Sequence, residues 1–239
     1  MGPRAASLRP LLRSLVHLVF PPRCCGCDAE IEDGLICTGC YSQLLSGRLA
    51  VCPGCGRPLS GQGERCGRCG VPFAPVRVRA LGHYAPPYSS LVHTLKYSGR
   101  KRLVPVLGGA LARLVESDPD LSRADLLCPV PLHPVRLRER GYNQSELLAR
   151  EVAAAVGVPM VDCLVRRRNT RTQTGLDDDR ARQRNMRGAF AVPPGFRLEE
   201  KVVVLLDDVT TSGATLDAAA RQLLKAGASS VLGLVVAAA

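Results

Sequence analysis

The stretch Val204–Leu216, VLLDDVTTSGATL, constrains the fold of this chain more than any other segment. Continuous apolar residues lead into two adjacent carboxylates, Asp207 and Asp208, and small residues follow before a helical pattern begins. An unbroken apolar run fits a strand that is covered on both faces, as in parallel sheets. The loop after such a strand lies at the carboxyl edge of the sheet, where ligands bind in open α/β folds. The segment therefore predicts an α/β protein with a binding site in this loop.

The residues of this loop suit a phosphorylated sugar. Small side chains let a phosphate approach the backbone N–H groups and the helix N-terminus. The carboxylates of Asp207 and Asp208 can accept hydrogen bonds from two vicinal ribose hydroxyls, and they favour a magnesium ion that accompanies a pyrophosphate. A polar N-cap would account for one Asp or one Thr, but not for the whole pattern. The expected phosphate-binding residues are Thr210, Thr211, Ser212, Gly213, Ala214 and Thr215.

Strand-like and helix-like segments alternate along the second part of the chain. Apolar runs predict strands at residues 76–81, 126–132, 159–165, 201–207 and 230–236. Helical periodicity and good helix formers predict helices around residues 91–96, 103–116, 145–156 and 214–226. This alternation indicates βαβ units, and hence a parallel sheet that is flanked by helices.

Nine of the eleven cysteines lie between residues 24 and 69, in two halves that each contain two CxxC pairs. Two such pairs complete a tetrahedral zinc site, and a site made only of cysteine has no open position for catalysis. The similar spacing favours one structural zinc per half, although an interleaved pairing stays open. Cys25 lies inside the first pair, and Cys24 is preferred because it keeps the two-residue spacing. The expected ligands are Cys24, Cys27, Cys37, Cys40, Cys52, Cys55, Cys66 and Cys69.

Three regions follow from these patterns. Residues 1–23 are expected to form an amphipathic helix, residues 24–72 a double zinc module, and residues 76–239 the α/β domain. The N-terminal apolar run is too short to span a bilayer and lacks the cleavage site of a secretion signal. The chain is therefore expected in the cytoplasm, where reducing conditions favour metal thiolates over disulfides.

Positive charge, carried mainly by Arg, gives the chain a formal net charge of +11. Guanidinium groups suit phosphorylated metabolites and nucleic acids. A GC-rich genome, which favours Arg codons over Lys codons, would produce the same excess of Arg. The polar segment 166–187 lies between two predicted strands. In that position a mobile active-site loop is favoured over a solvated connection.

The motif VVVLLDDVTTSGATL resembles the phosphoribosyl-diphosphate (PRPP) signature of type I phosphoribosyltransferases, and is most similar to the orotate-type version. Nearly the whole chain resembles the ComF family, which includes GntX. The shared segments are LVFPPRCCGC, the CxxC pairs, LKYSGRKRL, PVPLHPVRLRERGYNQSELLA and TRTQTGLDDDRARQRNMRGAF. The resemblance implies a type I phosphoribosyltransferase fold, with a Rossmann-like parallel sheet, behind a zinc ribbon module.

The resemblance also implies roles for individual residues. Asp207 and Asp208 would contact the ribose hydroxyls at the catalytic centre, and residues 211–215 would hold the 5′-phosphate. Residues 131–140 resemble the pyrophosphate loop, with Arg136 and Arg140 as anion contacts. Magnesium and Arg would stabilise the departing pyrophosphate. The family's flexible loop is matched by residues 166–187, with the candidates Arg168, Thr172, Gln173 and Arg180.

One departure from the purine enzymes bears on function. Many of them carry an acid at the position of Thr211, so either the acceptor differs here or catalysis is absent. Three hypotheses follow: a magnesium-dependent transferase for an unidentified acceptor, a non-catalytic single-stranded DNA-binding accessory protein, and a regulatory module that senses PRPP. The family's association with DNA uptake implies single-stranded DNA and the competence machinery as partners. An aromatic content of 4% argues against base stacking as the main mode of binding.

Overall fold

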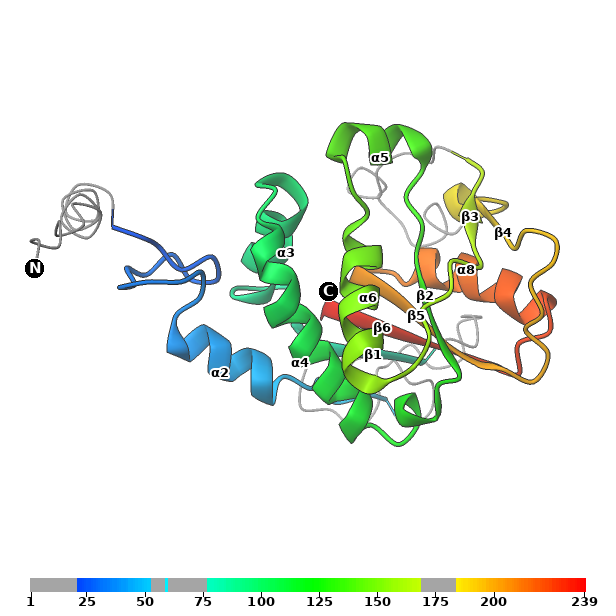
Figure 1. Cartoon of the computed structure of the whole chain (residues 1–239), viewed down its shortest axis with the longest axis horizontal. Coiled ribbons are helices and arrows are strands. Elements are labelled where there is room, and N and C mark those ends of the chain that lie inside the picture. Colours follow the sequence, from blue (N-terminus) through cyan, green and yellow to red (C-terminus); the bar gives the residue numbers. More distant parts are fainter. Residues whose placement is uncertain (1–20, 53–58, 60–76, 169–183) are drawn as a thin grey trace, which may run out of the picture.

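A four-stranded parallel sheet forms the centre of the computed structural model, which describes residues 21–52, 59, 77–168 and 184–239. Its strand order is β1-β6-β5-β2 (Figure 1). In one row of the sheet, Leu127, Val204 and Leu232 lie side by side. The strands are β1 (Arg77–His83), β2 (Leu126–Pro129), β5 (Val202–Thr210) and β6 (Ser230–Ala238). The predicted α/β class is confirmed.

Helices cover both faces of the sheet because successive strand residues point to opposite sides. Val204 and Leu206 of β5 pack in one core cluster, together with residues of α3 (Tyr88–Tyr97), α4 (Val104–Ser117) and α6 (Gln144–Val156). Val203 and Leu205 pack in a second cluster, against α8 (Ala214–Lys225). The fold is therefore a three-layer sandwich in which β5 is buried on both faces.

The predicted strand at residues 159–165 is wrong. Residues 159–161 run beside β2, where Leu127 donates to Pro159 and accepts from Val161. The chain then turns tightly, since the Cys163 N–H donates to the Val161 carbonyl at 2.9 Å. Beyond this turn, β3 (Val165–Arg166) pairs antiparallel with β4 (Phe190–Ala191) in a separate two-stranded sheet. The apolar run thus includes both a segment that runs beside β2 and the start of β3, and its composition does not show where one ends and the other begins.

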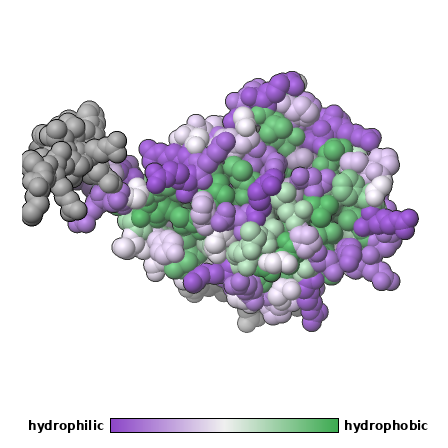
Figure 2. Space-filling view, viewed as in Figure 1, coloured by the Kyte–Doolittle hydropathy of each residue, from purple (hydrophilic) through white to green (hydrophobic). Residues whose placement is uncertain are grey.

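A short helix, α5 (Pro134–Arg140), lies between residues 132 and 145, where periodicity predicts neither a helix nor a strand. His133 caps it by accepting a hydrogen bond from the Val135 N–H at 3.3 Å, and Pro134 begins it. Gly141 ends it in the left-handed conformation, with φ of 76°. No residue of α5 is buried, and Figure 2 shows strongly hydrophilic side chains at the top of the molecule, where α5 lies.

The first cysteine pairs pack directly against the α/β layers. The helix that follows them, α2 (Thr38–Ser46), places Leu44 in the same core cluster as Leu91 and Leu95 of α3. The Tyr88 hydroxyl donates to the Gln43 carbonyl at 2.8 Å. Residues 1–20, on which the predicted N-terminal helix falls, lie outside the described part of the chain. None of the described helices is long and apolar enough to cross a membrane.

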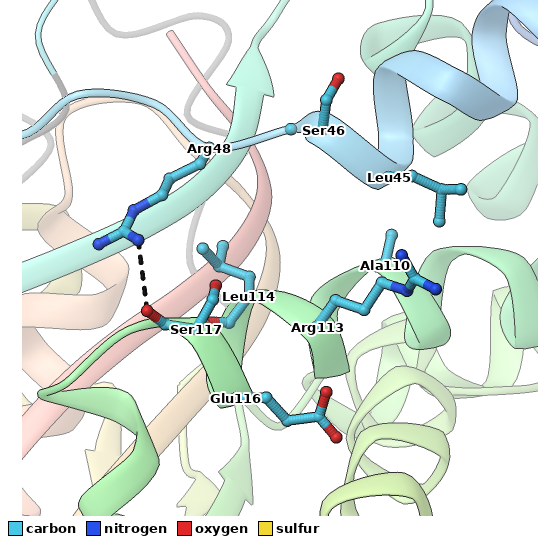
Figure 3. A pocket seen from close by; sticks show the side chains of 9 residues that line it. Leu45, Ser46, Arg48, Ala110, Arg113, Leu114, Glu116 and Ser117 are labelled. Carbon is cyan, nitrogen blue, oxygen red and sulfur yellow. Dashed lines mark hydrogen bonds between the residues drawn. The ribbon is translucent and has the colours of Figure 1, made fainter.

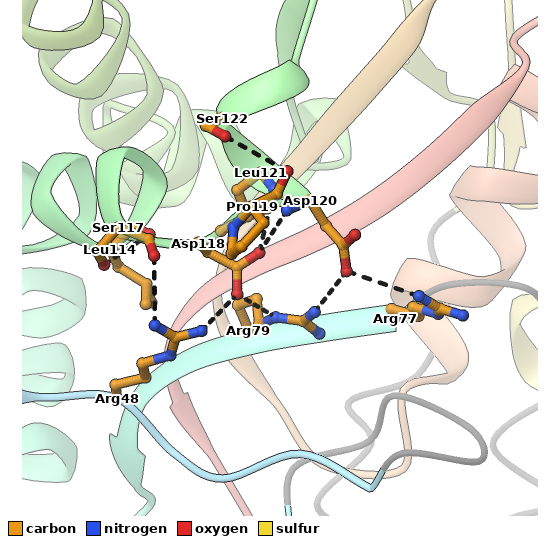
Figure 4. A network of polar contacts seen from close by, with 10 residues as sticks. All are labelled: Arg48, Arg77, Arg79, Leu114, Ser117, Asp118, Pro119, Asp120, Leu121 and Ser122. Carbon is orange, nitrogen blue, oxygen red and sulfur yellow. Dashed lines mark hydrogen bonds and ion pairs between the residues drawn. The ribbon is translucent and has the colours of Figure 1, made fainter.

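Ion pairs fasten the segment after α2 near the amino edge of the sheet (Figure 4). Arg79 of β1 contacts the carboxylates of Asp118 at 2.7 Å and Asp120 at 2.8 Å. Arg48 reaches Asp118 at 3.1 Å. Burial alone would raise the pKa of Asp118, but Arg79 and two backbone N–H groups outweigh it and the pKa is lowered. The network keeps Asp118 ionised and ties residue 48 to β1.

A groove of 590 Å³ separates the end of α2 from α4 (Figure 3). Leu45 and Leu114 provide its apolar surface, while Arg113 and Glu116 are polar. Arg48 and Ser117 line it as well, and these residues also belong to the network of Figure 4. The groove is therefore a seam between α2 and α4 near the amino edge of the sheet.

Candidate functional site

Two buried carboxylates mark the carboxyl end of β5. Asp207 Oδ1 accepts hydrogen bonds from the Ser145 hydroxyl and from the Asp208 N–H, both at 2.9 Å. Asp208 Oδ2 forms an ion pair with Lys96 Nζ at 2.9 Å. The Asp208 side chain is 4% exposed and that of Lys96 is 21% exposed. The structure thus places a hydroxyl donor and an ammonium group around the predicted acidic pair.

Burial shifts the ionisation of this cluster. Loss of solvent, followed by the negative charge of Asp208, raises the pKa of Asp207 to about 7. Lys96, the Asp208 N–H and the Ser145 hydroxyl act in the opposite direction. Burial alone would lower the pKa of Lys96, but Asp208 outweighs it and the pKa is raised. Lys96 therefore stays an ammonium ion, while Asp207 titrates near neutral pH.

The segment Gly141–Ser145, GYNQS, holds the neighbouring elements together. The Tyr142 hydroxyl donates to the Leu95 carbonyl of α3. Asn143 caps α6 through its contact with the Ser145 N–H at 3.1 Å, and its amide donates to the Val130 carbonyl at 3.0 Å. These contacts aim Ser145 at Asp207, so this motif from the sequence supports the carboxylates directly.

The loop after β5 meets α8 at Gly213, whose φ of 77° is readily adopted by glycine. The Ser212 hydroxyl accepts a hydrogen bond from the Ala214 N–H at 3.4 Å. Thr210 and Ser212 are buried, whereas Thr211 is exposed. The first N–H groups of a helix lack partners within the helix, and they favour an anion. This loop is therefore suited to bind a phosphate.

A cationic cavity of 250 Å³ lies between the end of α3 and α5. It is lined by Lys96, Tyr97, Gly99, Arg136, Glu139, Arg140 and Tyr142. The structure thus brings the two predicted anion contacts, Arg136 and Arg140, to one cavity with Lys96. Since Lys96 also contacts Asp208, the cavity and the carboxylate pair are adjacent.

The ends of the predicted flexible loop also approach this region. Arg166 lies over the Phe190 ring, with its guanidinium carbon 5.5 Å from the ring centroid. Burial and the charge of Arg136 lower the pKa of Arg166, while the charge of Asp207 raises it. Arg168 donates to the Arg187 carbonyl at 2.5 Å and so joins the two ends of the loop. The candidates Thr172, Gln173 and Arg180 lie outside the described residues.

Four thiols of the first cysteine half converge. The Sγ atoms of Cys24, Cys27, Cys37 and Cys40 all lie within 4.8 Å of one another. Cys25 is not among them; its Sγ accepts a hydrogen bond from Arg100 at 3.2 Å. In the second half, Cys52 is buried, and Cys55, Cys66 and Cys69 lie outside the described residues.

Backbone N–H groups favour the thiolate form of Cys24. Burial alone would raise its pKa, but the N–H groups of Cys37, Cys27 and Gly26 lower the pKa to about 6. The hydrogen bonds from Cys37 N and Gly26 N to the Cys24 sulfur measure 3.2 and 3.4 Å. A thiolate is the form of cysteine that binds metal.

Sequence reasoning did not select Lys96 or Ser145 as site residues, and it included Arg166 only as the first residue of the flexible loop. Lys96 and Ser145 occur in LKYSGRKRL and GYNQSELLA, segments that carried the family resemblance. Their presence in these segments was the sign in the sequence that Lys96 and Ser145 could belong to the site. Neither motif indicates that its polar side chain contacts residues 207–208, because that contact depends on the packing of α3 and α6 beside β5.

Asp207→Asn tests the raised pKa. Between about pH 4 and pH 7 the folded protein binds more protons at Asp207 than the unfolded chain does, so this group lowers stability as pH rises. Asn cannot ionise. We expect Asp207→Asn to increase the free energy of unfolding by about 1–3 kcal/mol at pH 8, with a much smaller gain at pH 5. Urea denaturation at both values measures this.

Asp125→Asn is the matched control, because a backbone N–H from Val202 lowers the pKa of Asp125. This substitution should decrease stability at pH 8. An equal effect of Asp207→Asn at pH 5 and pH 8 would contradict the raised pKa.

Comparison with known proteins identifies the family. A model of the double zinc ribbon domain matches residues 15–73, and a model of the phosphoribosyl transferase domain matches residues 143–239. DNA utilization protein YhgH of Salmonella typhimurium is 35% identical over 225 residues, which cover 90% of this chain and 96% of that protein. Competence protein F of Haemophilus influenzae is 30% identical, covering 89% and 95%.

Competence protein ComFC of Bacillus subtilis is 26% identical, covering 82% of this chain and 80% of that protein. These relatives carry names that refer to DNA utilization and competence. The chain belongs to the ComF/GntX family of phosphoribosyltransferase-like proteins with an N-terminal double zinc ribbon.

Proposed function

We propose that this protein binds PRPP or a related phosphoribosyl ligand at the carboxyl edge of its sheet, and that it takes part in DNA utilization. The observation that carries the proposal is the adjacency of the buried carboxylate pair and the cationic cavity, which Lys96 connects. A phosphoribosyl diphosphate presents vicinal hydroxyls beside a diphosphate, and so it matches this adjacency.

Each part of the ligand has a complementary group in the chain. Residues 211–215 and the N-terminus of α8 bind the 5′-phosphate. Asp207 and Asp208 accept hydrogen bonds from the ribose hydroxyls, and Arg136 and Arg140 bind the diphosphate. A magnesium ion that accompanies the ligand would neutralise charge on the diphosphate.

The same site supports transfer of the phosphoribosyl group to an unidentified acceptor. Arg136 and Arg140 stabilise the negative charge that develops on a departing diphosphate. The family resemblance assigns residues 166–187 the role of the loop that excludes water from the reacting sugar. Since Thr211 is not an acid, a proton of the acceptor would need another base.

Zinc is the metal that we assign to the cysteines, with a structural role. Zn–S bonds of about 2.3 Å separate the sulfurs of a tetrahedral site by about 3.8 Å. The Cys27 and Cys37 sulfurs are 3.7 Å apart. Cys52, Cys55, Cys66 and Cys69 are proposed to hold a second ion. Thiolate–zinc sites persist in a reducing cytoplasm.

Calorimetric titration with PRPP and excess Mg²⁺ tests the ligand. We expect the wild type to bind, and Asp207→Ala/Asp208→Ala to weaken binding at least tenfold, because the ribose hydroxyls lose their acceptors. Asp125→Ala, near the start of β2, is the control and should retain the wild-type affinity. Failure of the wild type to bind PRPP would refute both the transferase and the PRPP sensor.

Metal analysis of purified variants tests the zinc ligands. The wild type should contain two zinc ions per chain. Cys24→Ser should lose about one of them, whereas Cys25→Ser should retain both, because only Cys24 lies in the four-thiol cluster. Equal loss of zinc in the two variants would refute this assignment, and fewer than two ions in the wild type would refute sequential pairing.

Single-stranded DNA binding is the second candidate function, and an exposed aromatic side chain favours it. Tyr97 is 68% exposed, and the Arg140 guanidinium carbon lies 5.6 Å from its ring centroid. Stacking on an aromatic ring beside an Arg is a common mode of single-strand recognition. In this function the DNA and the proteins of the competence machinery are the partners.

Fluorescence anisotropy with a labelled oligothymidine tests this candidate. Affinity should fall steeply with salt, and Tyr97→Ala should weaken binding about tenfold through the loss of stacking. Tyr41→Ala is the control, because Tyr41 is 46% exposed on α2. Absence of wild-type binding at low salt would remove this candidate.

A further inference from the structure

Lys96 contacts Asp208, one of the two carboxylates to which a divalent cation would be expected to bind. Its ammonium nitrogen forms an ion pair with Asp208 Oδ2 at 2.9 Å. Mg²⁺ binds carboxylate oxygens at about 2.1 Å, so a magnesium ion on that oxygen would lie beside the Lys96 ammonium group, and the two positive charges would repel each other. The question is therefore which cation neutralises the carboxylate pair.

The structure holds Lys96 in place through α3. Leu91 and Leu95, on the same helix, are fully buried in the core. The Tyr88 hydroxyl joins the beginning of the helix to α2, and the Tyr142 hydroxyl donates to Leu95 beside Lys96. The side chain is only 21% exposed. Lys96 is thus a positioned cation rather than a freely moving surface lysine.

The remaining contacts of the pair also favour a built-in cation. Asp207 Oδ1 already accepts two hydrogen bonds, from Ser145 and from the Asp208 N–H, which leaves that oxygen poorly placed for a metal. Arg166 adds a further positive charge near Asp207. An ammonium group has three donors, so Lys96 can contact Asp208 and still donate to an anion in the cavity that it lines.

We infer that Lys96 takes the place of the magnesium ion at the carboxylate pair, so that a phosphoribosyl ligand binds without a divalent cation. This inference rests on the proposed function. Lys96 is a binding residue here: it neutralises Asp208 and donates to the diphosphate. Its loss should convert a magnesium-independent site into a magnesium-dependent one.

Calorimetric titration of the full chain with PRPP, in EDTA and in excess Mg²⁺, tests the inference. The wild-type dissociation constants should agree within about threefold. Lys96→Met should weaken binding at least tenfold in EDTA and recover most of it in Mg²⁺, whereas Lys96→Arg should still bind in EDTA. Lys201→Met is the control and should bind like the wild type, because Lys201 pairs with Asp125 at 3.5 Å, just before β5 begins.

The outcomes separate the inference from the proposed function. Wild-type binding that is at least tenfold weaker in EDTA would overturn the inference and leave the proposed function standing. Absence of binding under both conditions would refute the proposed function itself. A second measurement needs no PRPP: Mn²⁺ titration followed by electron paramagnetic resonance.

In that titration Lys96→Met should gain a Mn²⁺ site relative to the wild type, and Lys96→Met/Asp208→Asn should lose it again. The double variant removes both charges, so it avoids leaving a buried carboxylate unpaired. Equal Mn²⁺ binding by the wild type and Lys96→Met would overturn the inference.

Discussion

Burial of two neighbouring carboxylates at the end of β5 is the constraint on which the rest of the site depends. A buried charge is costly unless it is paired and hydrogen-bonded. Asp207 and Asp208 obtain these partners from helices that precede β5 by many residues: Lys96 from α3 and Ser145 from α6. The packing of α3 and α6 on one face of the sheet therefore determines both the ionisation of Asp207 and the shape of the cavity beside the pair.

Much of the fold could be predicted from the sequence because its signals are local. Apolar runs indicate β5 and β6, and helical periodicity indicates α4, α6 and α8, whose inner faces are buried. Periodicity failed where it carries no information. It cannot detect α5, which has no buried residue, and it cannot distinguish an apolar strand from the tight turn that ends at Cys163.

The candidate site could be predicted in part, for a related physical reason. Asp207 and Asp208 were recognisable because the strand, the acids and the small residues follow one another in the chain. Lys96 was not, since its contact with Asp208 joins residues more than a hundred positions apart. The Arg48–Asp118–Arg79 network escaped prediction in the same way. Such contacts are consequences of topology, and no spacing within a single motif encodes them.

Leu44 and Tyr88 bear on whether the α/β domain can be separated from α2. Leu44 completes the core beneath α3, and Tyr88 joins α3 to the backbone of α2. A fragment that began at β1 would expose the apolar surface that Leu44 covers. The described part of the zinc-ribbon module is therefore joined to the α/β layers through a shared core and not through a linker alone.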